Sequence, residues 1–170
     1  MSKLTRWTVD MASNTDEFDE IVPLTETASE FPRIDDRFTG VKNRYTWGLE
    51  MDMSRPCELK GGSAGGFLMN CLFLKDLETG DEQHWWCGPV SSLQEPCFIP
   101  RTPDAPEGDG WIVQVCNRLE DYNSDLLIFD ALDIEKGPVA TVHIPIRLRF
   151  GLHGNFARSE DIGLKVAEPA

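Results

Sequence analysis

The sequence predicts an all-β fold, and three observations support this prediction. Apolar stretches are short, with polar turn residues between them. Stretches rich in β-branched and aromatic residues recur roughly every 8 to 15 residues. Glycine, at 14 residues, and proline, at 11, are frequent enough to favour many turns over long helices. Short strands at this spacing are typical of a sandwich, a barrel or a propeller.

The predicted strands can be placed in order along the chain. They cover residues 6–9, 45–49, 66–74, 82–86, 110–116, 126–130 and 139–144. Residues 76–80 have turn chemistry, so residues 67–86 are expected to form a β-hairpin. Residues 121–124 supply another turn, because Asp, Asn and Ser side chains bond to nearby backbone groups. The acidic stretch 15–20 holds few apolar residues, which favours an exposed connection over a helix.

Two stretches roughly 55 residues apart share one plan. Residues 73–86 (FLKDLETGDEQHWW) and 128–144 (IFDALDIEKGPVATVHI) each run from an apolar strand through an aspartate and a turn with glycine to a second strand. Each unit could be half of a propeller blade. A propeller needs about four to eight blades, whereas 170 residues have room for roughly three. An open arc of this kind would leave strand edges uncovered.

Charge and composition exclude several classes of function. The chain holds 29 acidic and 16 basic residues, which gives a formal net charge of -13 and a pI of about 4.5. Such a surface repels phosphate groups, which argues against nucleic-acid binding and docking to anionic lipid. No stretch approaches the roughly 18 apolar residues of a membrane-spanning helix. The first residues contain no apolar run of signal-peptide length, so we expect a cytoplasmic protein.

The cysteines point to the same compartment. There are five, an odd number, and no CxxC pair occurs. A disulfide framework or a zinc ribbon is therefore disfavoured. We expect reduced, mostly buried thiols, as is usual in the cytosol. The five are Cys57, Cys71, Cys87, Cys97 and Cys116.

Three histidines are the candidates for metal or acid–base chemistry. His143 lies in a predicted strand between two apolar residues that share the other face, so its ring is expected to face solvent. His84 precedes two tryptophans, and partial burial against an indole is the expected environment. His153 lies between Gly151 and Gly154, whose missing side chains suit an imidazole held close to backbone or to a ligand. No HExxH or specific Ser-His-Asp pattern occurs.

Two glutamates lie close to prolines. Glu95 directly precedes Pro96, and Glu30 is two residues before Pro32. Because proline restricts the residue before it to extended conformations, each carboxylate could have a fixed direction. Such an acid could hold a metal-bound histidine through its second ring nitrogen. The alternative, which the residues alone favour, is a solvated acid in a loop.

Six separated sequence blocks span almost the whole chain. They are RWTVD (6–10), EFPRIDDRFTGVKNRYTW (30–47), EPCFIPR (95–101), DGWIVQV (109–115), LLIFDALD (126–133) and GPVATVHIPIRLRFGLHGNF (137–156). In this order they resemble the carotenoid cleavage oxygenase family, which includes carotenoid, apocarotenoid and stilbene dioxygenases. The blocks belong to the C-terminal third of a family member. We therefore expect residues 1–158 to be the C-terminal portion of the family's propeller and residues 159–170 to be a tail.

The resemblance implies a seven-bladed β-propeller, of which this chain would form roughly the last two to three blades. Family members carry a non-haem iron(II) ion on the propeller axis, held by four histidines, and glutamates hydrogen-bond three of these. They use O2 to cleave a carbon–carbon double bond into two carbonyl products. His153 matches the last iron-binding histidine, and Glu30 and Glu95 match two of the glutamates. The expected partners are O2 and an apolar alkene, which would be a carotenoid, an apocarotenoid or a stilbene.

The chain also departs from the family. Three of the four iron histidines have no counterpart, and His84 and His143 lie at strand positions that the family does not use for iron. One hypothesis is the C-terminal part of an iron-dependent dioxygenase. A second is a catalytically inactive truncated family member that acts as a binding or interaction module, and a third is a generic β-rich module. Membrane association is expected only through parts of a family member that this chain lacks.

Overall fold

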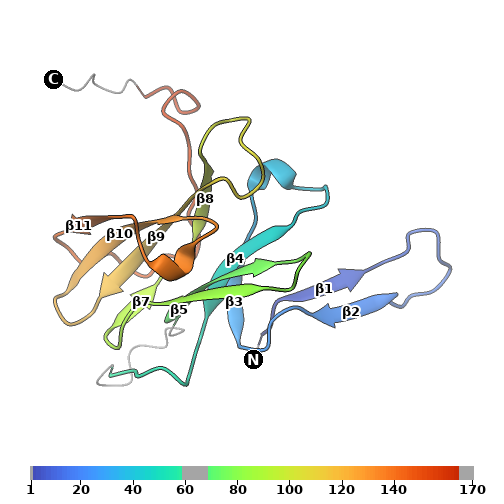
Figure 1. Cartoon of the computed structure of the whole chain (residues 1–170), viewed down its shortest axis with the longest axis horizontal. Helices are drawn as coiled ribbons and strands as arrows, with labels where there is room; N and C mark the ends of the chain where they lie inside the picture. Colours follow the sequence, from blue (N-terminus) through green and yellow to red (C-terminus); the bar gives the residue numbers. More distant parts are fainter. Residues whose placement is uncertain (1, 59–68, 165–170) are drawn as a thin grey trace.

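The computed structural model describes residues 2–58 and 69–164, and it is built from strands (Figure 1). The strands are β1 (Thr5–Thr8), β2 (Glu20–Pro23), β3 (Ser29–Arg33), β4 (Tyr45–Glu50), β5 (Cys71–Asp76), β6 (Glu82–Trp86), β7 (Ser91–Leu93), β8 (Cys97–Pro100), β9 (Gly110–Arg118), β10 (Asn123–Asp130) and β11 (Ala140–Ile144). Two short 3-10 helices, η1 (Asp36–Phe38) and η2 (Ile134–Lys136), lie in connections. Among these residues no helix is long and apolar enough to cross a membrane. The all-β prediction is confirmed.

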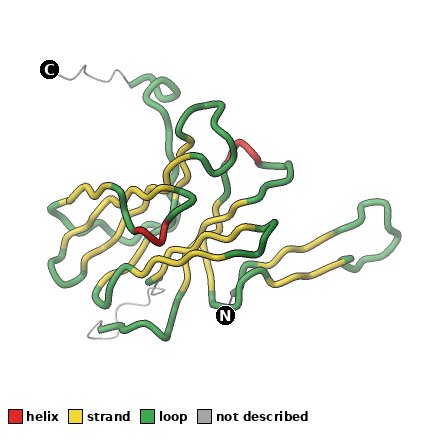
Figure 2. The backbone as a smooth tube through the Cα atoms, in the orientation of Figure 1, coloured by secondary structure: helices red, strands yellow, loops and turns green. Residues whose placement is uncertain are grey.

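The strands, drawn in yellow in Figure 2, form three antiparallel sheets. β1 and β2 pair as a hairpin. The four-stranded sheet has the order β3-β4-β5-β6, so its strands follow one another in the chain. The five-stranded sheet has the order β11-β10-β9-β7, and β8 also pairs with β9. Neither of the larger sheets closes on itself within the described residues.

Most predicted strands are present, and the missed ones are short. The hairpin expected over residues 67–86 is confirmed as β5 and β6, although residues 67 and 68 lie outside the described residues. The repeated strand–turn–strand units are both present, as β5–β6 and as β10–β11. The second turn ends earlier than expected, because β10 already begins at Asn123. The sequence analysis missed β2, β3, β7 and β8, which hold prolines, serines or glutamates and therefore have weak strand propensity.

The main hydrophobic core lies between the four-stranded and five-stranded sheets, and Trp47 on β4 is at its centre. Trp47 is fully buried, and its ring stacks on Phe98 of β8 with 5.0 Å between centroids. Its indole N–H donates a hydrogen bond of 2.8 Å to the carbonyl of Ala131, directly after β10. Because both partners belong to the five-stranded sheet or its border, Trp47 joins the two sheets.

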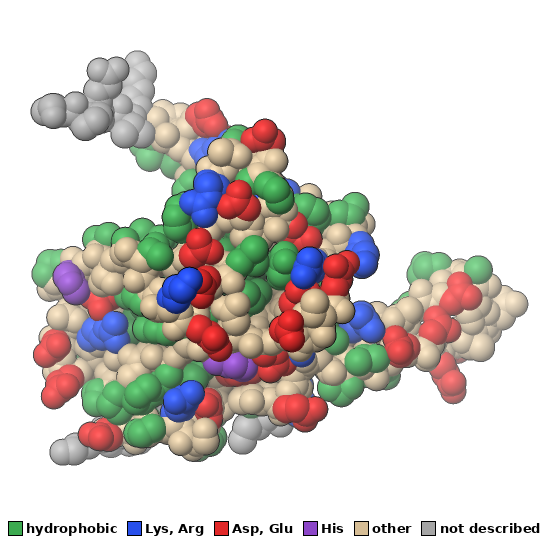
Figure 3. Space-filling model, in the orientation of Figure 1, with side chains coloured by type: hydrophobic (Ala, Val, Ile, Leu, Met, Phe, Trp, Pro, Cys, Tyr) green, Lys and Arg blue, Asp and Glu red, His purple; other side chains and the backbone are tan. Residues whose placement is uncertain are grey.

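The β1–β2 hairpin projects from the rest of the molecule (Figure 1). Trp7 packs edge-to-face on Phe18, with 4.5 Å between ring centroids, yet 55% of Trp7 is exposed. Val9, Met11 and Ile21 are also exposed, and hydrophobic side chains are visible on the hairpin in Figure 3. A two-stranded unit of this kind buries too little apolar surface to be stable alone.

His84 on β6 is half-buried, as expected, and its polar partners are carboxylates. Its Nδ1 lies 3.0 Å from Glu50 Oε2, and its Nε2 lies 3.3 Å from Glu82 Oε2. The Glu50 side chain is only 4% exposed. The hydrogen bond with Glu50, with the charges of Glu50 and Glu82, raises the pKa of His84 above its ordinary value against the opposing effect of burial. When the ring is protonated, it neutralises a buried carboxylate.

Trp47→Phe should lower the free energy of unfolding by about 2–4 kcal/mol, because it leaves a cavity and an unsatisfied carbonyl at Ala131. The measurement is urea unfolding of both proteins at neutral pH. Trp7→Phe is the matched control: Trp7 is 55% exposed, so the change should stay within about 0.5 kcal/mol. Equal losses in the two variants would contradict the central role of Trp47.

The His84 pair should make stability depend on pH. A histidine whose pKa is higher in the folded state stabilises the fold fully below its unfolded pKa of about 6.5. That stabilisation is lost as the pH rises through the folded-state pKa. The melting temperature of the wild-type chain should therefore fall between pH 6 and pH 8 more steeply than that of His84→Gln. Trp7→Phe, which changes an exposed residue and no titratable group, is the control and should keep the wild-type slope. Identical slopes in all three proteins would refute the contribution of His84.

Candidate metal centre

His153 lies in the irregular segment that follows β11. Its side chain is 78% exposed, and its Nδ1 is 3.4 Å from Glu95 Oε1. The ring of Phe31 meets the imidazole edge-on, with 6.0 Å between centroids. The partners of the ring are thus two side chains, and most of the imidazole is open to solvent. The expectation of an imidazole close to backbone or to a ligand stays a prediction.

Glu95 lies in the connection between β7 and β8, and its carboxylate is the fixed part of the pair. The side chain is 7% exposed. The backbone N–H of Gly154 donates a 2.8 Å hydrogen bond to its Oε2, and Arg33 Nη1 lies 3.6 Å from its Oε1. The solvated-loop alternative is therefore wrong for Glu95. A carboxylate with these partners stays in one orientation and presents one oxygen to His153.

Arg33 connects the two sides of this centre. It comes from β3, whereas Glu95 precedes β8 in the other large sheet. Besides its contact with Glu95, Arg33 donates from Nη2 to Asn155 Oδ1 at 3.2 Å, two residues after His153. Sequence reasoning missed Arg33, although it lies in the block EFPR that contains Glu30.

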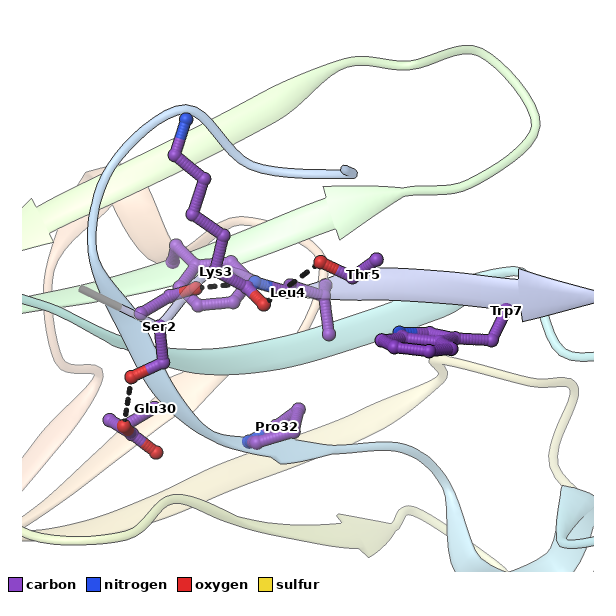
Figure 4. Close-up of a pocket in the computed structure, with 9 residues that line it drawn as sticks. Ser2, Lys3, Leu4, Thr5, Trp7, Glu30 and Pro32 are labelled. Atoms are coloured by element: carbon purple, nitrogen blue, oxygen red, sulfur yellow. Dashed lines mark hydrogen bonds between the residues drawn. The ribbon is translucent and has the colours of Figure 1, made fainter. Parts of the chain in front are cut away.

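Glu30 lies apart from His153. It is on β3 next to a register shift between Glu30 and Arg33, and Phe31 there has a left-handed backbone with φ of +53°. The hydroxyl of Ser2 donates a hydrogen bond to Glu30 Oε1 (Figure 4). Both residues line an open cavity of about 360 Å³, and Trp7 is also part of its lining. None of the hydrogen bonds of Glu30 within the described residues goes to a histidine.

The other two histidines lie on the sheets and contribute nothing to this centre. His84 is on β6 with its two carboxylates. His143 is 84% exposed, as expected, and its Nδ1 lies 2.7 Å from the nearly buried Asp125. The structure therefore brings together only two of the three predicted site residues, Glu95 and His153.

At this centre, the described residues provide one imidazole that could bind a metal, that of His153, and the Glu95 carboxylate contacts its Nδ1. When Nδ1 carries the proton and donates it to Glu95, the Nε2 lone pair is free, which is the state that a metal requires. No group of three or more His, Cys, Asp or Glu side chains within residues 2–58 and 69–164 is placed to hold an ion. His153 and Glu95 thus fit one corner of a histidine-ligated metal centre, whose other ligands would come from outside these residues.

Comparisons with known proteins find relatives over nearly the whole chain. The lignostilbene-alpha,beta-dioxygenase isozyme III of Sphingomonas paucimobilis is 49% identical over 154 residues, which cover 91% of this chain and 31% of that protein. The crystal structure of a Pseudomonas brassicacearum lignostilbene dioxygenase is 39% identical and superposes with a TM-score of 0.85 over 91% of this chain and 32% of that one. The crystal structure of a cobalt-substituted Synechocystis apocarotenoid oxygenase is 28% identical and superposes with a TM-score of 0.79. The match covers 92% of this chain and 30% of the apocarotenoid oxygenase chain.

These matches establish both the relationship and its extent. The chain spans about a third of the length of the relatives it matches. Its fold resembles that of the carotenoid oxygenase structures across nearly all of its own residues. The family model described as retinal pigment epithelial membrane protein matches residues 1–158. The chain therefore belongs to this family, which includes the lignostilbene and apocarotenoid oxygenases.

Proposed function

We propose that this chain is the C-terminal part of a non-haem iron(II) dioxygenase. The whole enzyme would use O2 to cleave the carbon–carbon double bond of an apolar alkene into two carbonyl products. The observation that carries the proposal is the contact between His153 and the buried Glu95, in a stretch that matches the family over residues 1–158. Bound iron(II) would supply the activation of O2.

The residues of this chain would hold and orient the ion. His153 would donate its Nε2 lone pair, and Glu95 would fix the ring and the tautomer through Nδ1. By accepting the Nδ1–H, the nearly buried Glu95 carboxylate would strengthen the imidazole as a ligand without binding the ion itself, and Arg33 would help to fix that carboxylate in place. Glu30 would play the same part for a second histidine from outside the described residues. Its position beside an open cavity leaves room for such a ring.

The fold supports a partial propeller. In this proposal the four-stranded sheet is one blade and the five-stranded sheet is the next. The β1–β2 hairpin would be the outer half of a third blade, which accounts for its exposed apolar side chains. Seven such blades would complete the ring. Residues 1–158 would be the propeller portion and residues 159–170 a tail.

The substrate would be an alkene of the stilbene type. A relative that is 49% identical is named for lignostilbene, whereas the apocarotenoid oxygenase is 28% identical. Carotenoid and apocarotenoid cleavage are the alternatives. The net charge of -13 argues against nucleic acid as a partner. The five cysteines are free thiols, which is consistent with the cytoplasm as the proposed location.

The alternative function is a catalytically inactive family member that serves as a binding or interaction module. It is favoured by the single imidazole at the centre and by the exposed apolar side chains of the hairpin.

One histidine holds iron(II) poorly against water. The 170-residue chain alone should therefore retain no iron after anaerobic loading with Fe(II) and desalting, and one iron per chain would refute that expectation.

A chimera separates the two functions. Residues 1–158 of this chain, which match the family model, replace the matching stretch of the Sphingomonas paucimobilis lignostilbene dioxygenase. The chimera should contain about one iron per chain and cleave lignostilbene, and His153→Ala in the chimera should abolish both. Iron content is measured by elemental analysis and cleavage by product formation. A folded chimera that lacks iron would support the inactive module, and full iron content in His153→Ala would refute the ligand assignment.

Glu95→Gln in the same chimera should weaken iron retention by about 10–100-fold, because the amide is a weaker acceptor for the imidazole N–H. Loss of iron during dialysis against a chelator is the measurement. Glu82→Gln, which changes a carboxylate on β6, is the matched control and should retain iron normally. Normal iron retention in Glu95→Gln would contradict the orienting role.

A further inference from the structure

The segment that carries His153 is attached to the sheets by side chains. In the described part of the chain, residues 145–157 make no backbone–backbone hydrogen bonds. Five side chains from the body of the molecule bind this segment instead. They are Ser124 at Leu148, Gln94 at Arg149 and Gly151, Glu95 at Gly154, and both Arg33 and Cys97 at Asn155. The position of His153 therefore depends on particular side chains and not on a strand ladder.

Gln94 makes the two-point contact in this set. Its Nε2 donates to the carbonyl of Arg149 at 3.3 Å, and its Oε1 accepts from the N–H of Gly151 at 3.1 Å. The carboxamide thus pairs with the segment as a backbone peptide of a neighbouring strand would. A Cβ at Gly151 would lie 2.8 Å from Gln94 Oε1, so glycine at this position permits the contact.

Gln94 is itself firmly held. Its backbone N–H donates to the carbonyl of Val115 on β9 at 2.9 Å. Its own carbonyl accepts a 2.7 Å hydrogen bond from Nε2 of Gln114, a side chain that is 1% exposed. The carboxamide of Gln94 therefore extends from a backbone that β9 fixes on both sides.

We propose that Gln94 is a positioning residue, which sets the place of His153 relative to Glu95. Gln94 and Glu95 bind the segment at different points. Gln94 accepts a hydrogen bond from Gly151, whereas Glu95 contacts His153 and Gly154. His153 lies two positions after Gly151, a reach of at most about 7 Å, so a shift at Gly151 moves the imidazole. This inference rests on the proposed role of His153 as a metal ligand.

The chain offers a matched control for this contact. Gln83 on β6 makes the same two-point contact with another segment, because its Nε2 donates to the Leu132 carbonyl at 2.9 Å and its Oε1 accepts from the Ile134 N–H at 3.0 Å. Gln94→Met and Gln83→Met remove equivalent hydrogen bonds with similar side-chain volume. They differ in which segment they release.

The first measurement is amide hydrogen exchange by NMR on the 170-residue chain. Gln94→Met should speed the exchange of Gly151 and Gly154 by about tenfold, the effect of losing about one net hydrogen bond. Gln83→Met should speed exchange at Ile134 and leave Gly154 unchanged. An unchanged Gly154 rate in Gln94→Met, or an equal rise in Gln83→Met, would overturn the proposal. If Gln94→Met does not fold, Gln94→Glu replaces it, since it keeps the acceptor for Gly151 and removes the donor to Arg149.

The second measurement is cobalt(II) affinity of the chimera. Gln94→Met should weaken cobalt binding by about tenfold, and Gln83→Met should leave it unchanged. Wild-type affinity in Gln94→Met would overturn the positioning role, while the proposed dioxygenase would stand. Retention of cobalt in His153→Ala would instead refute the ligand role of His153, and with it the basis for Gln94. The failure of the inference and the failure of the proposed function are thus distinguishable.

Discussion

The contact of Trp47 with the opposite sheet is the interaction on which the rest of the structure depends. Its ring stacks on Phe98, and its indole N–H reaches the carbonyl of Ala131. The candidate centre uses residues from both sheets, since Arg33 is on β3 and Glu95 precedes β8. A contact between these two side chains requires that the sheets be held in one relative position. The packing around Trp47 therefore determines the geometry of the site, although no atom of Trp47 belongs to it.

The candidate centre is built from an irregular segment on a rigid support. Backbone ladders hold the sheets, whereas side chains hold residues 145–157. In this arrangement Gly151 lies close to the Gln94 side chain, and most of the His153 side chain is exposed to solvent. An imidazole with one fixed nitrogen and one exposed nitrogen suits a ligand that arrives from outside the described residues. The same feature makes the position of His153 sensitive to changes in a few side chains.

The carboxylates inside the fold are paired with histidine or arginine side chains. The nearly buried carboxylates of Glu50, Glu95 and Asp125 each meet a histidine, and Arg33 and Arg118 accompany the last two. Unpaired buried carboxylates would be strongly unfavourable. Asp35, which is also buried, pairs with Arg37. Many other acidic side chains lie on the surface, as Figure 3 shows for one face. Net charge thus describes the exterior of this protein, whereas the interior carboxylates have local partners.

The sequence by itself determined the strand-rich fold, the two strand–turn–strand units and the family to which the chain belongs. These features depend on local patterns: alternating apolar residues, turn residues and six ordered blocks. It also named Glu95 as a candidate through the resemblance to the family, whereas the residues alone favoured a solvated acid in a loop. Only the tertiary structure decided that Glu95 is nearly buried, that it meets His153 while Glu30 does not, and that Arg33 and Gln94 take part. The reason is physical: Arg33 and Asn155 are separated by 122 positions in the chain, and no local pattern reports a contact between residues that only packing brings together.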